Sequence, residues 1–457
     1  MAEPAPVVNP YAYDNSAVQA PPATLAGALR RVGPGLVLTA SIVGSGELIA
    51  TTKLGAEVGY VLLWAVIISC LIKVVIQGEI GRYTIATGET ALQFMNHMPG
   101  RIFGLSWPIW LWTIAGVLVM FAVGGMYGGV AQTLNLIMPA IGVDIWVGVL
   151  LLITLAVLLT GSYVQIEFVA TLLVAIFTVL TVVTAAMLLL HPEYFSWSSV
   201  SKGLAFDVPN KGFFTAIAVF GITGVGAIEL TQYPYWCVEK GYARFAGVYD
   251  GSPAWTARAR GWIRVMHADI LVAMLIYTFA TVAFYLLGAG VLNTLGLIPE
   301  SSKMIENLSK MYTEMLGNTG LYLFFFGAIA VLYSTIFAAT AGMSRQFADL
   351  VSLAGVYPAT NYPQRLKWQR IMVVVFNAGP VLLYYAVKLP ALMVVITGVS
   401  IALLLPIVAI CTLYLRYKKL PQEVAPPQWV SVLLWITTIV ITVGMTWYAL
   451  KQLPMFK

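Results

Sequence analysis

Two glutamates stand in the middle of long apolar stretches, and each follows a pair of glycines. Glu47 ends the run Gly44-Ser45-Gly46-Glu47, and Glu229 lies three positions after Gly224-Val225-Gly226. Paired glycines interrupt a helix, and an interruption frees backbone N–H and C=O groups that need other partners. Carboxylate, hydroxyl and backbone oxygens together are the ligands of a hard cation. We therefore predict a substrate or metal site made by Glu47, Glu229, Gly44, Ser45, Gly46, Thr223, Gly224 and Gln232.

The elements that position these residues are membrane-spanning helices. Hydrophobic residues make up 60% of the 457 residues and charged residues only 10%, whereas a soluble protein carries about 25% charged residues. Apolar runs of about 20 residues recur, which is the length that an α-helix needs to cross a bilayer. The sequence predicts an all-α polytopic membrane protein with about eleven spans, at residues 34–56, 59–86, 105–135, 141–160, 164–190, 212–237, 264–293, 318–350, 370–388, 391–416 and 428–450.

Basic residues predict how the chain is oriented in the membrane. With the N-terminus in the cytoplasm, most Lys and Arg residues of the loops fall on the cytoplasmic side, as is typical of membrane proteins. An odd number of spans then puts the C-terminus outside, in a multi-pass protein of the cytoplasmic membrane. The net charge of +6 largely reflects this asymmetry and indicates contact with anionic membrane lipids rather than with nucleic acid.

The two interrupted spans are the first and the sixth, which indicates an internal repeat. Interrupted segments in corresponding positions of two inverted repeats are typical of secondary transporters, whose substrate site lies between them. No phosphate-binding loop and no nucleophile–base arrangement is seen in the sequence, so we expect a transporter without a cofactor and not an enzyme. We expect this transporter to be a monomer. The expected parts are a flexible N-terminal tail (1–30), a first five-helix repeat (31–190), a second five-helix repeat (191–417) and an extra C-terminal transmembrane helix (418–457).

One long segment resembles a known family. The run "GPGLVLTASIVGSGELIATTKLGAEVGYVLLW" is similar to the first helix and the start of the second in the natural resistance-associated macrophage protein (NRAMP) family of divalent-metal transporters. The similarity extends more weakly through the other spans. It implies a LeuT-type fold with two inverted five-helix repeats. It also implies alternating access around a site between broken helices 1 and 6.

The sequence departs from the family where the metal is bound. The Asp-Pro-Gly-Asn motif of the family's first helix is replaced by the run that ends in Glu47, and its Met-Pro-His motif by Val225, Gly226 and Ala227. A site without methionine sulfur and rich in oxygen favours Mg²⁺ or Mn²⁺ over softer transition metals. In this respect the chain resembles the NRAMP-related magnesium transporters.

The third span contains no Asp, Glu, His, Lys or Arg between residues 107 and 137. The family's proton route uses acidic residues on this helix and the histidine of the sixth. Because protons cannot pass along groups that do not titrate, we expect weak or no proton coupling by this route.

Several further polar residues are candidates for the pathway or its gates. Glu79 and Arg82 are three positions apart on one helix face, and we expect a gating pair or a structural ion pair at the cytoplasmic end. Lys73 lies deeper in the same span, where it either pairs with a carboxylate such as Glu79 or extends to the membrane surface. Thr397 and Ser400 on the tenth span are expected to line the pathway.

An alternative hypothesis is that the protein is a transporter whose substrate is not a metal ion. Since the ligand side chains of the family are replaced, the freed helix N–H groups could instead bind the carboxylate of an amino acid or another organic or anionic solute. Glu47 or Glu229 would then bind a substrate amine or carry a coupling proton. The expected partners are therefore a divalent cation or a small solute, together with membrane lipids.

Overall fold

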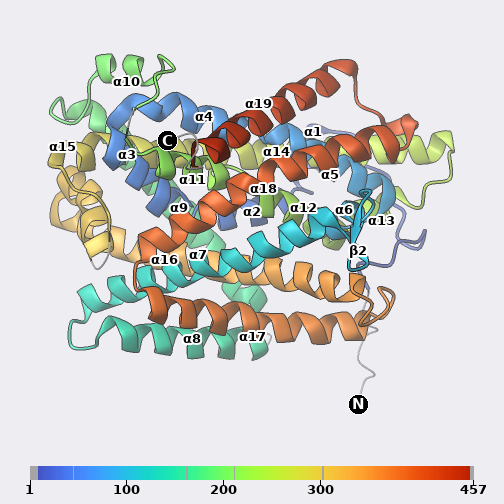
Figure 1. Ribbon diagram of the computed structural model, residues 1–457, viewed down its shortest axis with the longest axis horizontal. Coiled ribbons are helices and arrows are strands. Elements are labelled where there is room, and N and C mark those ends of the chain that lie inside the picture. Colours follow the sequence, from blue (N-terminus) through green and yellow to red (C-terminus); the bar gives the residue numbers. More distant parts are fainter. Residues whose placement is uncertain (1–8, 45, 161–162, 210, 301–302, 453–457) are drawn as a thin grey trace.

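The computed structural model describes residues 9–44, 46–160, 163–209, 211–300 and 303–452. Within these ranges, eight helices are long and apolar enough to cross a membrane, and two more apolar helices, at Val143–Leu158 and Val174–Leu190, are shorter. The long helices run roughly parallel to the long axis of the molecule (Figure 1). Helices suit the apolar runs because every backbone polar group is then satisfied within its own segment.

The first half of the chain is helical apart from one short hairpin. Its elements are α1 (Leu25–Leu29), α2 (Pro34–Ile42), η1 (Gly46–Thr51), α3 (Thr52–Val58), η2 (Gly59–Leu62), α4 (Leu63–Ile72), α5 (Val74–Thr87), α6 (Ala91–Met95), β1 (Arg101–Ile102), β2 (Leu105–Ser106), α7 (Trp107–Ile137), α8 (Val143–Thr160) and α9 (Tyr163–Met187). The two strands pair antiparallel, with Arg101 opposite Ser106.

The second half is helical in its described residues. Its elements are η3 (Leu188–Leu190), α10 (Trp197–Gly203), α11 (Phe213–Ile222), α12 (Ala227–Lys240), α13 (Tyr242–Ala246), α14 (Pro253–Leu287), η4 (Gly288–Leu292), α15 (Asn293–Leu295), α16 (Met304–Leu353), α17 (Tyr362–Val387), α18 (Pro390–Lys418), η6 (Gln422–Val424) and α19 (Gln428–Gln452). Within α16 the backbone turns sharply at Gly317 (φ 61°, ψ −151°), one residue before the predicted span begins.

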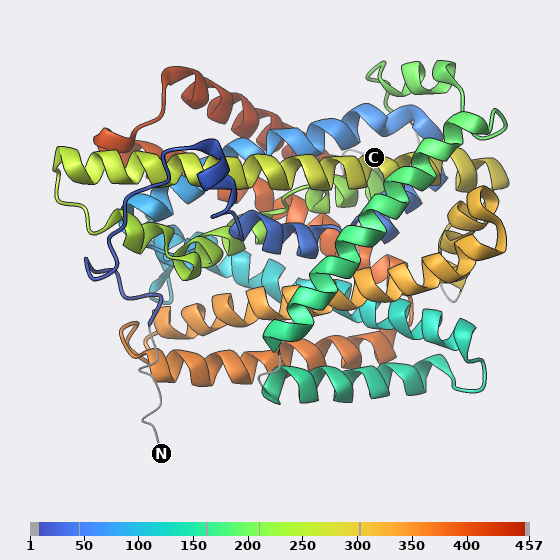
Figure 2. The same ribbon diagram turned by 180° about the vertical axis from the view of Figure 1, so that it is seen from behind.

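Each of the eleven predicted spans falls on one helix or on an adjoining set of helical segments. The central helix α7 packs against α16, α17 and α18, while α2 packs against α14 and α16. At one edge of the molecule α8 lies beside α17, as Figures 1 and 2 both show. The interior that these helices enclose holds the two interruptions.

Both predicted interruptions are present. Between α2 and η1 the chain leaves the helix after Ile42 and re-enters it at Gly46 as a π-helical turn. Between α11 and α12 it leaves after Ile222 and re-enters at Ala227, and Gly224 adopts a φ of 61° that side-chain-bearing residues rarely tolerate. The first and sixth spans are therefore broken near their middle, which confirms that part of the prediction.

The N-terminal segment differs from the expected flexible tail, because its described residues pack against the bundle. The Tyr11 hydroxyl donates to Glu239 at 2.6 Å, and the Tyr13 hydroxyl lies 3.0 Å from the carbonyls of Ala86 and Gly247. Burial raises the pKa of Tyr13 to about 12, so this residue stays a neutral donor. In Figure 2 the dark-blue segment crosses one end of the helices. Hydrogen bonds from Tyr11 and Tyr13 thus hold the described part of the N-terminal segment, which its composition alone predicts to be flexible.

Candidate functional site

Glu229 lies beside a small buried cavity at the second break. It is in the first turn of α12, whose N-cap is Gly226; the residue as a whole is half-buried, but its Oε2 atom is buried. Its Oε2 atom has no hydrogen-bond partner. The cavity has a volume of about 50 Å³ and is also lined by hydroxyl, backbone and thioether groups. These come from Ser41, Gly46, Met126, Thr335 and Thr397.

Glu47 occupies the matching place at the first break, in the first turn of η1, but it faces another helix. Its Oε1 lies 3.1 Å from the Thr281 hydroxyl of α14, and its Oε2 has no partner. The single proton of that hydroxyl is shared with the Tyr277 carbonyl at 2.7 Å. Glu47 is not among the residues that line the cavity beside Glu229. The two carboxylates interact electrostatically. They do not line one common cavity, as two side chains that hold the same ion would.

Both glutamates lie where a helix resumes after a break. The first N–H groups of a helix have no partner in the helix, and they carry the positive end of its dipole. This end stabilises a nearby carboxylate by about 0.3–1 kcal/mol, or more where it is partly buried. The sequence therefore puts each carboxylate where the backbone itself supports a negative charge.

Lys73 lies at the junction of α4 and α5 and is fully buried. Its Nζ donates to the carbonyl of Phe220 at 2.8 Å and to that of Thr223, and it lies 5.3 Å from the centre of the Phe220 ring. The predicted pairing with Glu79 is therefore wrong, and so is extension to the surface. Thr223 caps the C-terminus of α11, so the ammonium binds the carbonyl end of the sixth-span break.

Glu79 and Arg82 do form an ion pair, with Nε and Oε1 2.9 Å apart. Arg416 of α18 approaches the other oxygen of Glu79 at 3.5 Å, and Arg82 also donates to the carbonyl of Val424 at 3.1 Å. These contacts tie α5 to the C-terminal end of α18 and to the segment after it. The pair stands away from both breaks.

The predicted glycines serve close packing at the breaks. A Cβ on Gly44 would lie 2.0 Å from Oγ1 of Thr335, so α16 leaves room only for hydrogen there. A Cβ on Gly46 would meet Ile222 at 3.5 Å, an ordinary contact. A Cβ on Gly224 would come within 3.0 Å of the Cys70 backbone. Ser45 lies outside the described residues.

The predicted hydroxyl and amide ligands are more scattered than expected. The Thr223 hydroxyl lies 2.8 Å from that of Ser69 and donates to the Val219 carbonyl, so it faces α4. Gln232 packs against Gly342 of α16. Thr397 does line the cavity, and its hydroxyl bonds the Leu118 carbonyl at 2.8 Å. Ser400 instead bonds the Ile396 carbonyl of its own helix and borders an apolar groove against α7.

Two further pockets lie around the first and sixth spans. One, of about 310 Å³, is lined by Lys53, Glu57, Thr215 and Glu300 together with the first residues of α18. Lys53 forms ion pairs with both glutamates there, and its nitrogen is 3.2 Å from Glu57. Because Val395 lines this pocket and Val394 lines the cavity beside Glu229, the two spaces meet adjacent residues of α18.

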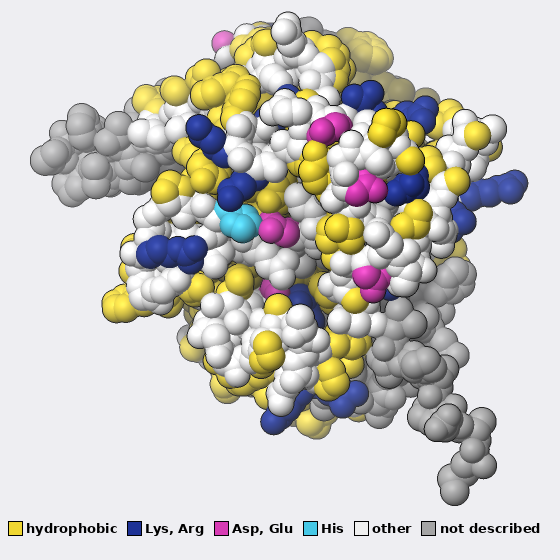
Figure 3. All heavy atoms as spheres, turned by 90° about the vertical axis from the view of Figure 1, so that its right-hand side faces the viewer, with side chains coloured by type: hydrophobic (Ala, Val, Ile, Leu, Met, Phe, Trp, Pro, Cys, Tyr) yellow, Lys and Arg dark blue, Asp and Glu magenta, His cyan; other side chains and the backbone are white. Residues whose placement is uncertain are grey.

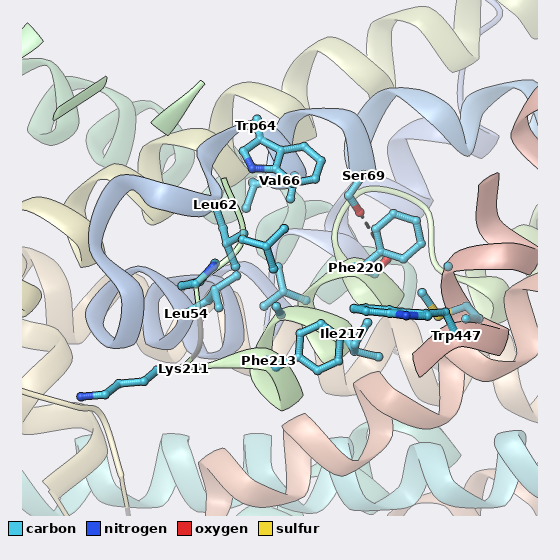
Figure 4. A pocket seen from close by; sticks show the side chains of 17 residues that line it. Leu54, Leu62, Trp64, Val66, Ser69, Lys211, Phe213, Ile217, Phe220 and Trp447 are labelled. Atoms are coloured by element: carbon cyan, nitrogen blue, oxygen red, sulfur yellow. Dashed lines mark hydrogen bonds between the residues drawn. The ribbon is translucent and has the colours of Figure 1, made fainter. Parts of the chain in front are cut away.

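The other pocket, of about 220 Å³, is apolar and lies between α4, α11 and α19 (Figure 4). Ser69 and Phe220 stand together at one side of it, and the side chain of Lys211 points away from it. Its lining suits hydrocarbon rather than a hydrated ion. It shares Ser69 and Phe220 with the Lys73 contacts but does not include either glutamate.

Sequence reasoning missed four residues that shape the site, namely Ser41, Met126, Thr281 and Thr335. Each is a single polarisable or hydroxyl side chain within an apolar span, a pattern shared with many packing residues. Within the described residues no group of three or more His, Cys, Asp or Glu side chains could hold a metal ion. Any cation at this site would therefore depend on backbone and hydroxyl oxygens as well as carboxylate.

Comparison with known proteins agrees with this architecture. The chain is 25% identical over 440 residues to the divalent metal cation transporter MntH of Brucella suis biovar 1 (strain 1330), covering 91% of this chain and 87% of that protein. A mutant of the manganese transporter of Eremococcus coleocola superposes with a TM-score of 0.65 at 16% identity, covering 94% of this chain and 88% of that one.

More distant transporters share the fold. The nucleobase-cation-symport-1 family transporter Mhp1 superposes with a TM-score of 0.56 at 13% identity, covering 98% of this chain and 97% of that one. The fold is thus the predicted LeuT type, and the matched proteins are transporters rather than enzymes. The family model "Natural resistance-associated macrophage protein-like" (Nramp) matches residues 35–450, and the chain belongs to this family.

Proposed function

We propose that this protein is a secondary transporter of a divalent metal cation, and that the cation binds between the two helix breaks. The observation that carries the proposal is the pair of buried carboxylates, each with one oxygen that has no partner. A buried charge without a partner is costly, so such a group either binds a cation or takes up a proton. Family membership and the names of the relatives support the same cargo.

The size of the cavity decides between a metal ion and an organic solute as the transported cargo. A volume of about 50 Å³ beside Glu229 has room for a few water molecules, since the centre of one water needs about 10–15 Å³ of such space. Pockets for organic ligands usually measure about 300–1,000 Å³. This conformation therefore favours a cation that has lost most of its water over an amino acid or another organic solute.

The ligands favour manganese, with magnesium as its competitor. Glu229, Ser41, Thr335 and Thr397 offer the oxygen atoms that both ions accept. Met126 adds a thioether, a soft ligand that manganese tolerates better than magnesium does. A methionine on α7 would thus supply the sulfur that the sixth span has lost.

We further propose that transport proceeds by alternating access between two inverted repeats, 31–190 and 191–417, with the helix after residue 418 outside both. The pocket near Lys53 would lead inward from the outside. Helix α7 (Trp107–Ile137) has no Asp, Glu, His, Lys or Arg, which supports weak or no proton coupling by this helix.

The distribution of basic residues supports an N-terminus in the cytoplasm and a C-terminus outside. Exposed basic residues border the end of the molecule that carries β1 and β2, which Figure 3 shows face on. The exposed basic residues that this orientation assigns to the cytoplasmic side include Arg30, Arg101, Arg260, Lys367 and Lys418. An excess of Lys and Arg marks the cytoplasmic side of membrane proteins.

Uptake into proteoliposomes with an internal pH dye tests the proposal. Saturable uptake of Mn²⁺ that is abolished in Glu229→Gln, without acidification, is the expected result. Met126→Leu should lower uptake of Mn²⁺ relative to Mg²⁺. Glu239→Gln is the matched control, because Glu239 lies on the same helix and pairs with Arg345 at the far end. Absence of metal uptake by folded wild-type protein would contradict the proposal. Acidification of the lumen during metal uptake would contradict the proposed lack of proton coupling.

A further inference from the structure

The carbonyl end of a broken helix needs donors, and in the sixth span a lysine supplies them. The last four carbonyls of a helix lack partners within it and carry the negative end of the dipole. At the end of α11, the carbonyls of Phe220 and Thr223 accept from Lys73 of the second span. Ser69, one turn before Lys73, adds its hydroxyl, at 3.2 Å from the Phe220 carbonyl and 2.8 Å from the Thr223 hydroxyl.

This group of oxygens has the chemistry of a monovalent cation site. In transporters with broken helices, unwound carbonyls and half-helix C-termini coordinate the coupling cation. Here the group consists of the carbonyls of Phe220 and Thr223 and the hydroxyls of Ser69 and Thr223; Ser69 and Thr223 are buried and Phe220 is half-buried. The ammonium that binds the two carbonyls comes from the protein and cannot leave.

The same charge acts on both carboxylates of the site. Lys73 interacts electrostatically with Glu47 and with Glu229, although it donates its hydrogen bonds to the backbone. Two ionised carboxylates and one ammonium sum to a local charge of −1, whereas the carboxylates alone give −2. A mobile divalent cation is therefore held less tightly with the lysine present than without it.

We propose that Lys73 is a tethered monovalent cation that fills the ion position of the sixth-span break and sets how much mobile positive charge the neighbouring site accepts. The second half of this statement rests on the proposed metal transport, and the first does not. Lys73 is thus a specificity-determining residue whose charge, rather than its shape, is decisive.

The experiment compares Lys73→Gln, Lys73→Arg and Lys53→Gln with the wild type. Lys73→Gln keeps an N–H donor and removes the charge, Lys73→Arg keeps the charge, and Lys53→Gln removes a largely buried lysine elsewhere. The thermal midpoint of each purified protein is measured in NaCl and in choline chloride of equal ionic strength. Mn²⁺ affinity is measured by titration calorimetry in both salts.

Only Lys73→Gln should respond to sodium. Its midpoint should rise by about 2–4 °C in NaCl, because Na⁺ enters the vacated carbonyl group while choline is too large. In choline it should bind Mn²⁺ about tenfold more tightly than the wild type, since one nearby positive charge is gone. In NaCl this gain should largely disappear. Wild type, Lys73→Arg and Lys53→Gln should show no difference between the salts.

The outcomes separate the two proposals. If Lys73→Gln shows no response to Na⁺, or if Lys73→Arg responds in the same way, the lysine is a structural support and the inference is overturned. If no protein binds Mn²⁺ but Lys73→Gln responds to Na⁺, the tethered cation stands and the proposed metal transport fails. If Lys73→Gln is unstable when purified in choline, NaCl should restore it, and failure to do so also overturns the inference.

Discussion

The two helix breaks hold equivalent places in the fold but satisfy their backbone in different ways. At the first break the chain folds tightly, with the Gly44 N–H bonded to the Ile42 carbonyl at 2.7 Å and Gly44 pressed against Thr335. At the sixth-span break the carbonyls of Phe220 and Thr223 turn outward and receive Lys73. One break is closed by packing and the other by charge.

The carboxylates differ in the same sense. Each has one oxygen without a partner, but Glu47 accepts from the Thr281 hydroxyl and lies outside the cavity, whereas Glu229 lines the cavity. The comparison teaches that similar motifs take different roles according to what the surrounding helices provide. Glu229 is the better placed to hold cargo, and Glu47 the better placed to adjust the local charge.

The largest expected effect on Mn²⁺ binding comes from replacing each of the two glutamates in turn by glutamine. Glu229→Gln should weaken Mn²⁺ binding by about 30-fold or more, because removing one partner of a buried charge pair costs at least about 2 kcal/mol. Glu47→Gln should weaken it by about fivefold, since that carboxylate acts from outside the cavity. Titration calorimetry on folded protein measures both. Equal losses would show that the two residues share the ion after all.

The next largest effect is expected on stability, where alanine at the two glycines of the first break should have different consequences. Gly44→Ala should lower the free energy of unfolding by about 1–3 kcal/mol, because its Cβ has no space beside Thr335. Gly46→Ala, whose Cβ would have its nearest contact at 3.5 Å from Ile222, serves as the control, and its free energy of unfolding should stay within about 0.5 kcal/mol of the wild type. Thermal unfolding in detergent gives the difference. A harmless Gly44→Ala would mean that this break is not closed by packing.

Removing the hydroxyl beside Glu47 should have a smaller effect. Thr281→Val keeps the shape and loses the hydrogen bond to Oε1, which is worth about 1 kcal/mol, or about fivefold in Mn²⁺ affinity. Combined with Glu47→Gln, it should add little, since both changes act on one interaction. Full additivity in a double-mutant cycle would argue that Thr281 acts elsewhere.

The smallest effect is expected at Ser400 of α18, with Thr397 of the same helix as the comparison. Ser400→Ala should leave uptake and stability unchanged, because its hydroxyl bonds its own helix outside the cavity. Thr397→Val should reduce uptake several-fold, since it removes a cavity hydroxyl that also bonds the Leu118 carbonyl. Uptake assays at matched protein density compare them. A clear loss in Ser400→Ala would extend the pathway to the groove against α7.

The sequence was sufficient for the helices and for their breaks. Long apolar runs and glycine pairs act locally, so the interruptions at Gly44–Gly46 and Gly224–Gly226 could be predicted without tertiary information. The directions of the side chains could not. A π-helical turn follows the first break and changes the angle between successive residues, which sends Glu47 towards Thr281. The partner of Lys73 was equally hidden, because backbone carbonyls have no residue signature.

The packed N-terminal segment has a mechanical consequence. The Tyr11 hydroxyl donates to Glu239, and Glu229 lies ten residues earlier on the same helix α12, about 15 Å away along its axis, with Pro234 between them. The described N-terminal residues are therefore connected, through Glu239 and α12, to the carboxylate at the sixth-span break.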